Sequence, residues 1–273
     1  MREVVFRGEG FELPLLVSDV LPAAFHHGFT TRRGGVSRAP FDTLNLGGRW
    51  SDAPDAVAEN RRRLRAAARA PAICFATQVH GAGVVRADVG TAPAVVAATE
   101  ADAVVAGGPG VVAGVAVADC VPVLIADART GAAAAVHAGW RGAVAGVVTA
   151  ALVRMAADLG TRPDDVRLAI GPSIGPCCFE VGPEVVAAVE AAWPSARGAG
   201  AIVDRQPRPH VDLWRLARLA AESWGVRPEA IDVAAVCTSC QRDRFFSYRR
   251  DGGKTGQMAA FITAARPAAA GER

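Results

Sequence analysis

The feature that most constrains the fold is a series of short apolar runs in the middle of the chain, separated by glycine and aspartate. Each run is rich in Val, Ala, Ile and Leu and has the length of a strand rather than of a helix. The runs span 103–105, 111–117, 121–126 and 132–136. Because they are almost continuously apolar, we expect strands that are buried on both faces of a sheet. Helices should then cover this sheet.

Several segments carry the signals of helix ends. A long helix is predicted at 142–159, where apolar residues form one stripe and Gly160 serves as the C-terminal cap. A second helix should begin near Asp52, because Ser51 or Asp52 can cap its free amides and Pro54 suits its first turn. Further helices are expected at 183–193 and 212–224, and further strands at 166–170 and 231–236.

The composition argues against several classes of protein. With 51% hydrophobic and 21% charged residues and a formal net charge of +3, the chain is expected to be globular and to bind no nucleic acid. No run approaches the roughly 18 apolar residues of a membrane-spanning helix, and residues 1–10 lack the apolar core of a secretory signal. We therefore expect a cytoplasmic protein with its six cysteines reduced. Residues 1–273 are interpreted as one domain that ends in a disordered tail at 267–273.

Three side chains that can bind a metal stand at successive strand ends. His80 follows the apolar run 73–76, Cys120 follows the run 111–117, and His137 follows the run 132–136. Ligands are often found where a strand leaves the core. Two His and one Cys are a ligand set typical of catalytic zinc, which leaves a fourth position for water. The spacing alone is a weak signal, because it is long-range.

Two other interpretations of these residues stay open. In the first, Cys120 is a small buried hydrophobic residue, His137 makes a backbone hydrogen bond and His80 lies in a surface loop. In the second, Cys120 is a thiolate nucleophile, His137 is its base, and Asp119 or His80 orients that base. The question is whether Cys120 binds a metal ion or attacks a carbonyl carbon.

The segment Cys-Thr-Ser-Cys at 237–240 has the spacing of redox and zinc sites. No second pair with this spacing exists, and Cys177 and Cys178 are too close to each other to form one. We therefore interpret Cys237 and Cys240 as packing residues in a loop.

Two basic, glycine-bearing segments could contact a ligand. Residues 30–37 could bind an anion through backbone amides and guanidinium groups, although their glycine spacing does not fit a P-loop. Residues 245–256 join aromatic faces to a basic turn, which suits either stacking on a ring or a half-buried core. From this segment alone we favour the core.

Many motifs, taken in order, point to one family. They include Gln-Val-His-Gly, Ala-Asp-Cys-Val-Pro, His-Ala-Gly-Trp-Arg-Gly and Phe-Ser-Tyr-Arg-Arg, and they lie at 31–37, 44–46, 59–61, 78–81, 118–122, 137–142, 169–172 and 246–250. Over nearly its whole length the chain resembles the YfiH-type laccase-domain family. Its members are described as multicopper polyphenol oxidases, purine nucleoside phosphorylases or peptidoglycan editing factors.

The resemblance implies a metal centre and a fold. His80, Cys120 and His137 would be the metal ligands, with zinc as the expected ion and copper as the alternative. The implied fold is α+β, with two packed mixed β-layers flanked by helices, similar to the cytotoxic-necrotizing-factor type of cysteine hydrolase. Periodicity alone does not predict that arrangement.

The implied activity is phosphorolysis of adenosine, inosine or methylthioadenosine, with deamination of adenosine as a second reaction at the same site. The partners would then be a purine nucleoside and phosphate. Cys120, His137, Arg61 and Arg141 would be the catalytic residues, and the two arginines would belong to an anion site that phosphorolysis requires.

Further substrate contacts follow from the same motifs. Arg33 and Ser37 would bind the anion, and Asn45 would bind ribose hydroxyls. The chain departs from the family pattern at Gln257, where an arginine is common, and Cys240 is not part of the usual pattern. Because the metal trio is intact, we expect Gln257 to bear on substrate preference more than on catalysis.

Two further activities are weighed against this one. Some members are implied to hydrolyse a wrongly built UDP-muramoyl-serine precursor, for which Cys120 would attack an amide. Copper-based phenol oxidation ranks last, because blue-type copper oxidases need a cluster of several His and the chain has five in all.

Overall fold

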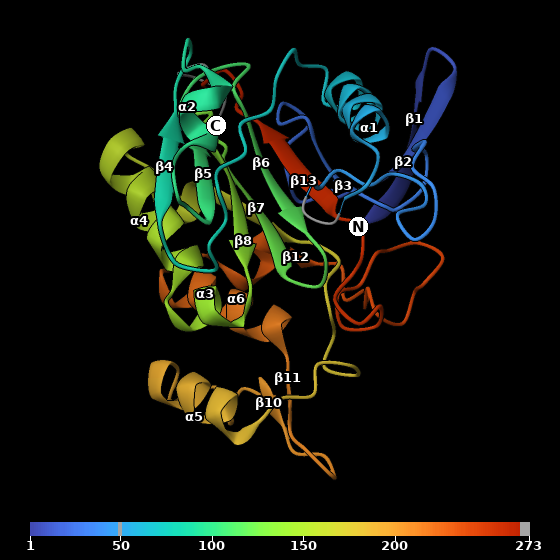
Figure 1. Ribbon diagram of the computed structural model, residues 1–273. Coiled ribbons are helices and arrows are strands. Elements are labelled where there is room, and N and C mark those ends of the chain that lie inside the picture. Colours follow the sequence, from blue (N-terminus) through green and yellow to red (C-terminus); the bar gives the residue numbers. More distant parts are fainter. Residues whose placement is uncertain (49–50, 268–273) are drawn as a thin grey trace.

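The computed structural model describes residues 1–48 and 51–267, which form two packed β-sheets with helices on the outer faces (Figure 1). The larger sheet has the order β12-β9-β7-β8-β5-β4. Its strands are β4 (Val84–Ala87), β5 (Ala103–Ala106), β7 (Val121–Asp127), β8 (Ala133–Ala138), β9 (Val166–Ile170) and β12 (Ile231–Val233).

The smaller sheet has the order β1-β2-β3-β13-β6. Its strands are β1 (Arg2–Gly8), β2 (Phe11–Val17), β3 (His27–Thr30), β6 (Val112–Val117) and β13 (Met258–Thr263), and a separate ribbon pairs β10 (Ile202–Val203) with β11 (His210–Val211). The helices are α1 (Pro54–Ala67), α2 (Pro93–Ala97), α3 (Trp140–Val144), α4 (Val147–Leu159), α5 (Pro183–Ala192) and α6 (Leu213–Ser223), with 3₁₀ turns at Pro163–Asp165 and Pro228–Ala230.

The larger sheet is buried on both faces, as its apolar runs predict. Successive side chains of a strand point to opposite faces. In β5, Ala103 and Val105 pack against the layer of α3, α4, α5 and α6. Val104 and Ala106 pack instead against the smaller sheet. The expectation that helices cover this sheet therefore holds for one face only, since the second sheet covers the other.

A third cluster closes the outer face of the smaller sheet. Leu64 of α1 packs there with Leu13 of β2 and Phe261 of β13. In Figure 1, α1 accordingly lies beside β1 and β2, on the far side of β13 from the larger sheet. The layers therefore follow one another as helix, sheet, sheet and helices, which confirms the α+β fold class.

The pairing of the strands brings distant segments together. The smaller sheet is antiparallel throughout, whereas the larger sheet is mixed, with β4–β5 and β12–β9 parallel. Strands β7 and β8 are antiparallel, and their register places Pro122 opposite His137. Cys120, which precedes β7, therefore lies beside the end of β8.

The predicted helix ends need two corrections. The helix expected at 142–159 is two helices, α3 and α4, because Gly146 takes a left-handed conformation with φ of 76° between them. The N-cap of α1 is Ala53, which has no side-chain cap, while Asp52 accepts hydrogen bonds from Ser37 and Asn45 instead. Gly160 caps α4 as predicted, with φ of 70°.

The strands of the smaller sheet are mostly absent from the sequence-based prediction. Strand β1 is largely exposed and carries charged residues, so its pattern is not that of a buried strand. Conversely, the run 73–76 forms isolated bridges rather than a strand, and the strand expected at 231–236 ends at Val233.

The predicted tail lies outside the described residues from position 268 onward. Among the described helices, none is long and apolar enough to cross a membrane.

Candidate metal centre

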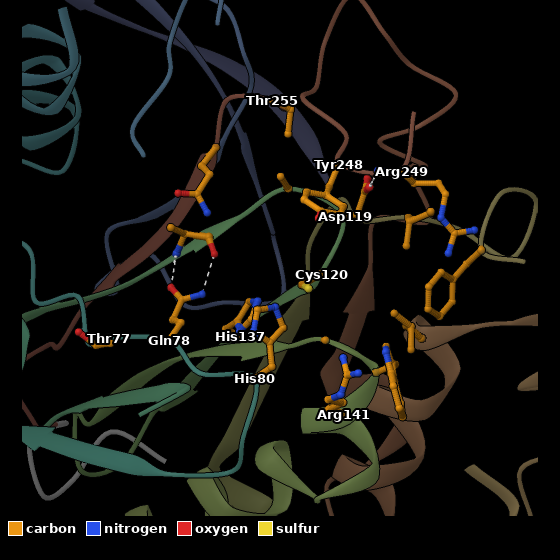
Figure 2. Close-up of a pocket in the computed structure, with 18 of the residues that line it drawn as sticks. Thr77, Gln78, His80, Asp119, Cys120, His137, Arg141, Tyr248, Arg249 and Thr255 are labelled. Atoms are coloured by element: carbon orange, nitrogen blue, oxygen red, sulfur yellow. Dashed lines mark hydrogen bonds between the residues drawn. The ribbon is translucent and has the colours of Figure 1, made fainter. Parts of the chain in front are cut away.

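The three predicted metal ligands meet at one point. One donor atom from each of His80, Cys120 and His137 lies within 4.8 Å of the other two. The two imidazole rings stand edge to face, with centroids 4.9 Å apart. Figure 2 shows all three side chains converging on the inner end of a pocket. They come from the loop before β4, the turn between β6 and β7, and strand β8.

Asp102 holds two of these ligands in place. Its carboxylate is fully buried and accepts a hydrogen bond from Nδ1 of His137 at 2.8 Å. It also accepts hydrogen bonds from the backbone amides of His80 at 2.9 Å and Gly81 at 2.7 Å. A carboxylate on Nδ1 fixes the tautomer of the ring, so Nε2 of His137 is left free to bind a metal.

The backbone around the trio leaves room for the donors. Gly139 lies so close that a Cβ atom there would sit 2.9 Å from the Cys120 sulfur and 3.1 Å from Cδ2 of His80. His80 itself has a φ of 62°, which a non-glycine residue rarely adopts. The hydrogen bond from the backbone amide of His80 to the Asp102 carboxylate keeps His80 in this conformation, with its ring directed toward Cys120.

The charges of the trio favour a thiolate. Burial on its own raises the pKa of Cys120, but the positive charge of His137 and hydrogen bonds from both imidazoles lower this pKa to about 6. Burial lowers the pKa of His137, yet the Cys120 thiolate and Asp102 together raise it to about 9. The thiolate is the form of cysteine that binds metals and acts as a nucleophile.

The donor set fits a zinc-type ion. Two imidazole nitrogens and one thiolate are ligands that zinc prefers, and three protein ligands leave one coordination position open. His80, Cys120 and His137 all line the pocket, whereas Asp102 is not among the lining residues. The three residues could therefore hold a metal ion with one position open to a substrate or to water.

The pocket above the trio has a volume of about 810 Å³. This lies within the roughly 300–1,000 Å³ of small-molecule sites. Aromatic side chains of Trp140, Phe179 and Tyr248 line it, together with the guanidinium groups of Arg141 and Arg249. The Tyr248 side chain is half exposed, and the Arg249 guanidinium lies over the Phe179 ring. The pocket thus offers flat apolar faces and positive charge near the trio.

The other predicted site residues lie in different places. Arg141 lines the pocket, and its guanidinium lies 4.4 Å from the centre of the Trp140 ring. Arg61 lines an adjoining hollow of about 480 Å³, which shares Gln78 and Gln257 with the pocket, and donates a hydrogen bond to the Leu46 carbonyl. Arg141 and Arg61 therefore lie in two hollows that share part of their walls.

Three further predicted residues line neither the pocket nor the adjoining hollow. Arg33 lines a separate hollow, where it donates a hydrogen bond to the carbonyl of Asp243. Ser37 and Asn45 are buried, and both donate hydrogen bonds to the Asp52 carboxylate. In this structure the hydrogen bonds of Ser37 and Asn45 hold the chain around α1 in place.

Asp102 and Gln78 are site residues to which the sequence-based prediction gave no role. The Gln78 side chain makes two hydrogen bonds with the backbone of Ala116, which fasten the His80 loop to β6 (Figure 2). A signal for Asp102 is present in the sequence, because a lone aspartate directly before an apolar strand must find partners when buried. Nothing in the sequence indicates which groups those partners are.

Asp119, next to Cys120, anchors the far wall of the pocket. Its carboxylate is buried and accepts hydrogen bonds from Thr238, Ser247 and the amide of Arg249. Burial is the main reason that the pKa of Asp119 is raised. The second alternative gives Asp119 or His80 the role of orienting His137, but it is Asp102 that hydrogen-bonds to Nδ1 of His137.

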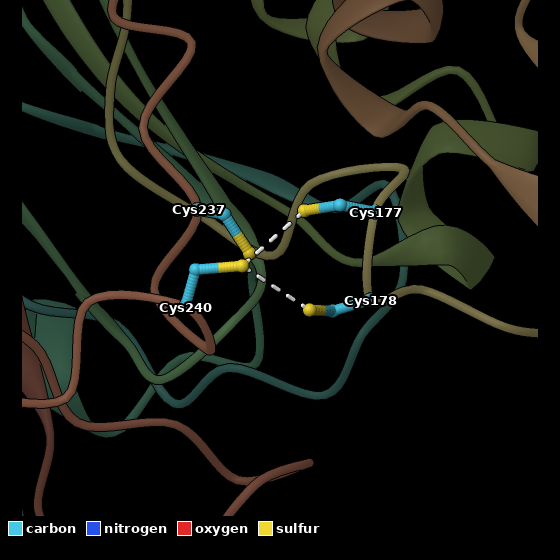
Figure 3. Close-up of side chains that lie close together, drawn as sticks. All are labelled: Cys177, Cys178, Cys237 and Cys240. Atoms are coloured by element: carbon cyan, nitrogen blue, oxygen red, sulfur yellow. Dashed lines mark hydrogen bonds between the residues drawn. The ribbon is translucent and has the colours of Figure 1, made fainter.

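The structure brings Cys237 and Cys240, which the sequence predicts to be packing residues in a loop, together with two more cysteines. One sulfur each from Cys177, Cys178, Cys237 and Cys240 lies within 4.8 Å of the others (Figure 3). Although Cys177 and Cys178 are adjacent in the sequence, the turn after Gly175 directs both of their sulfurs toward that of Cys240. Sequence spacing does not predict that the four sulfurs lie together, because their proximity depends on the pairing of β9 with β12.

Comparisons with known proteins agree with the motifs. A model of the family described as multi-copper polyphenol oxidoreductase laccase matches residues 26–265. A purine nucleoside phosphorylase of Deinococcus radiodurans is 44% identical over 253 residues, which are 92% of this chain and 92% of that protein. The purine nucleoside phosphorylase YfiH of Escherichia coli is 40% identical over 234 residues, which are 85% of this chain and 91% of that protein.

A solved structure supports the same relationship. YlmD from Geobacillus stearothermophilus has a TM-score of 0.85 and 32% sequence identity, and the match covers 96% of this chain and 98% of that one. Sequence and fold therefore agree over nearly the whole length. The chain belongs to the YfiH-like family that carries the laccase-domain description.

Proposed function

We propose that the protein is a metal-dependent purine nucleoside enzyme. It cleaves the N-glycosidic bond of adenosine, inosine or methylthioadenosine with phosphate, and deaminates adenosine as a second reaction. The names of the relatives support the substrate class. The observation that carries the proposal is the position of the His80, Cys120 and His137 trio on the wall of a nucleoside-sized pocket.

Zinc is the ion that we assign to this trio, with copper as the alternative. When bound, such an ion supplies Lewis-acid chemistry to an oxygen atom or to a leaving group. Cys120, His137 and His80 hold the ion, and Asp102 keeps the His137 ring in the tautomer that can bind it. Cys120 and His137 are therefore catalytic residues in this proposal.

The aromatic side chains of the pocket suit a purine. Tyr248, Phe179 and Trp140 all line the pocket together with the trio, so a base could stack on one of these rings. Aromatic stacking contributes about 1–3 kcal/mol per base in nucleic-acid complexes. This gives the segment 245–256 a role in substrate binding in addition to the core that its buried Phe245 and Phe246 provide.

Two arginines are the candidates for the phosphate. Among the described residues, no carboxylate pairs with Arg141 or Arg61 within salt-bridge distance, so their charges are available to an anion. In phosphorolysis the bond between the sugar and the purine nitrogen breaks as phosphate bonds to the sugar carbon, and the sugar gains positive charge. A phosphate held by Arg141 would stabilise that charge and be positioned for attack.

Gln257 marks a place where specificity can differ within the family. Gln257 lines both the pocket and the adjoining hollow, and its backbone amide donates a hydrogen bond to the side-chain oxygen of Asn45. A neutral carboxamide at this position provides hydrogen bonds but no charge. We infer that phosphate binding relies on Arg141 and Arg61, and that Asn45 positions Gln257. If Asn45 also contacts ribose, its side chain would have to leave its present hydrogen-bond partners.

One observation supports a second candidate, an amide hydrolase that uses Cys120 as its nucleophile. The thiolate, His137 and Asp102 form a chain of nucleophile, base and orienting carboxylate. In metal-free protein this arrangement could cleave an amide such as that of a UDP-muramoyl-serine precursor. A copper oxidase is less well supported, because of the five histidines only His80 and His137 belong to a group that could hold a metal.

The test is an assay of the purified, zinc-loaded protein with adenosine and phosphate. Chromatography resolves adenine, hypoxanthine and inosine. We expect adenine whose formation requires phosphate, with inosine as a slower product, and both should disappear in Cys120→Ala. Arg141→Ala and Arg61→Ala should raise the phosphate concentration needed for half-maximal rate.

Two outcomes would contradict the proposal. A phosphate dependence that is unchanged in both arginine variants would mean that the anion site is misplaced. A covalent adduct on Cys120 in active, metal-free protein would favour the amide hydrolase instead.

A further inference from the structure

Four cysteines from two distant segments form a second group of metal-binding atoms. Cys177 and Cys178 lie in the loop between β9 and α5, and Cys237 and Cys240 lie in the segment after β12. The Cys240 sulfur lies 3.5 Å from that of Cys177 and 3.4 Å from that of Cys178. Figure 3 shows the four sulfur atoms pointing toward one another from opposite sides.

The distances between the sulfur atoms match a tetrahedral metal site. A zinc ion bonded to four thiolates at about 2.3 Å places the sulfurs roughly 3.8 Å apart. The separations of the Cys240 sulfur from those of Cys177 and Cys178, 3.5 and 3.4 Å, are close to this value, and all four sulfurs lie within 4.8 Å of one another. A disulfide would require about 2.05 Å. A four-iron cluster binds each cysteine through a different iron atom, so it would hold the sulfurs farther apart than one ion does.

The backbone already makes the contacts that a metal-bound thiolate needs. The amide of Gly175 donates a hydrogen bond to the Cys237 sulfur at 3.3 Å. The chain turns between Cys237 and Cys240, where the amide of Gln241 donates to the carbonyl of Cys237. Such a turn lets two cysteines at this spacing reach one ion.

Two arginines donate hydrogen bonds to the backbone next to the cluster and add positive charge there, although the Arg250 charge is also paired with Asp251. The Arg249 guanidinium donates hydrogen bonds to the carbonyls of Cys178 and Glu180. The Arg250 guanidinium donates to the carbonyls of Thr238 and Ser239. A divalent ion with four thiolates carries a net charge of −2, so adjacent guanidinium groups stabilise the loaded site.

The cluster joins the two segments that form one wall of the pocket. The loop with Cys177 and Cys178 also carries Ile174 and Phe179, and the segment after Cys240 carries Tyr248 and Arg249. Since these segments are far apart in the sequence, a bond between them would fix the aromatic faces relative to each other.

We propose that Cys177, Cys178, Cys237 and Cys240 together bind one zinc-type ion as a closed structural site. Each thiol releases its proton to solvent as its sulfur binds the ion. All four positions around the ion are then filled by the protein, so the ion takes no part in the reaction. This inference is independent of the nucleoside activity proposed above.

The experiment measures zinc per chain in five forms of the full protein. The wild type should hold two ions, His80→Ala/Cys120→Ala/His137→Ala should hold one, and Cys178→Ser/Cys240→Ser should hold one. The variant with all five substitutions should hold none. Cys74→Ala is the matched control, because Cys74 is buried and belongs to neither group, and it should keep both ions.

Two further measurements detect the four-cysteine site without substituting any of its cysteines, so they do not depend on whether the cysteine variants fold. Cobalt added to the metal-free form of His80→Ala/Cys120→Ala/His137→Ala, the three-ligand variant, should give the intense near-ultraviolet thiolate-to-metal bands of a four-sulfur site. A mercurial reagent titrated into the zinc-loaded form should release one zinc as these thiols react. Absence of cobalt bands, no zinc in the three-ligand variant, or an intact mass lower by 2 or 4 Da from disulfides would each overturn the proposal.

Discussion

The two groups of metal-binding side chains differ in what surrounds them. His80, Cys120 and His137 supply three donors beside a pocket, and a buried carboxylate orients one of the rings. The four cysteines supply four donors and join two loops. Three ligands with an open position are typical of catalytic zinc, whereas four ligands that close the sphere are typical of structural zinc. We therefore propose that the second group builds one wall of the pocket and that the first group carries out the reaction.

The sharpest difference is expected in catalysis. Cys120→Ala or His137→Ala removes a ligand of the proposed ion, which contributes several kcal/mol to the transition state, so kcat/KM should fall about a thousandfold or more. Cys178→Ser/Cys240→Ser should change kcat/KM by less than about tenfold. Steady-state phosphorolysis of adenosine measures both. Equal losses in the two sets of variants would break the distinction between the groups.

In stability the order should reverse. The metal-linked cysteines include Cys177 and Cys240, which are 63 residues apart in sequence. Closing a loop of this length is worth about 4 kcal/mol in the chain-entropy estimate, or roughly 8–16 °C in Tm for a protein of this size. Thermal unfolding followed by circular dichroism should show this decrease in Cys178→Ser/Cys240→Ser and a smaller one in Cys120→Ala. A Tm that chelators leave unchanged in the wild type would speak against a structural ion.

The buried carboxylate gives a smaller effect that is confined to the first group. Asp102→Asn keeps the shape but weakens the hydrogen bond to His137, and it should lower zinc affinity at that site about 10–100-fold. Competition with a chromogenic chelator measures the affinity. Asp127→Asn is the control, because Asp127 is also fully buried but contacts the 129–130 turn, away from the trio. If both variants bind zinc equally well, Asp102 does not tune the site.

The last contrast concerns pH in the metal-free protein. The neighbouring imidazoles lower the pKa of Cys120 to about 6, so its thiolate persists above that pH and is lost only as the pH falls below it. The hydrogen bond between the Cys240 and Cys178 sulfurs is the main reason that the pKa of Cys240 is raised to about 11, so its thiolate forms only in strong base. Alkylation followed by peptide mass spectrometry should give midpoints in this order, and the reverse order would contradict it.

The sequence predicts the larger sheet and the trio better than the rest. Its continuous apolar runs indicate strands such as β5 and β7, because burial on both faces leaves no polar alternation. The smaller sheet is harder to predict, since β1 is exposed and charged and pairs through backbone hydrogen bonds that carry no side-chain signal. The break between α3 and α4 depends on the left-handed conformation of Gly146, which an apolar stripe does not report.

The candidate site, like the fold, is only partly predictable from the sequence. Motifs bring attention to His80, Cys120 and His137, but the role of Asp102 appears only when its strand packs beside β8. The cysteine cluster was missed because its members are grouped by the parallel pairing of β9 with β12 and by the loops that follow these strands. Long-range pairing of this kind leaves no periodicity in the sequence.

The most direct test of the account is a crystal structure of the zinc-loaded protein with anomalous diffraction data collected on both sides of the zinc absorption edge. We expect two zinc peaks. One should be bound by His80, Cys120, His137 and a non-protein ligand that faces the pocket, and the other by four cysteine sulfurs. A zinc peak absent from the trio, or a fourth protein ligand closing that site, would contradict the central claim.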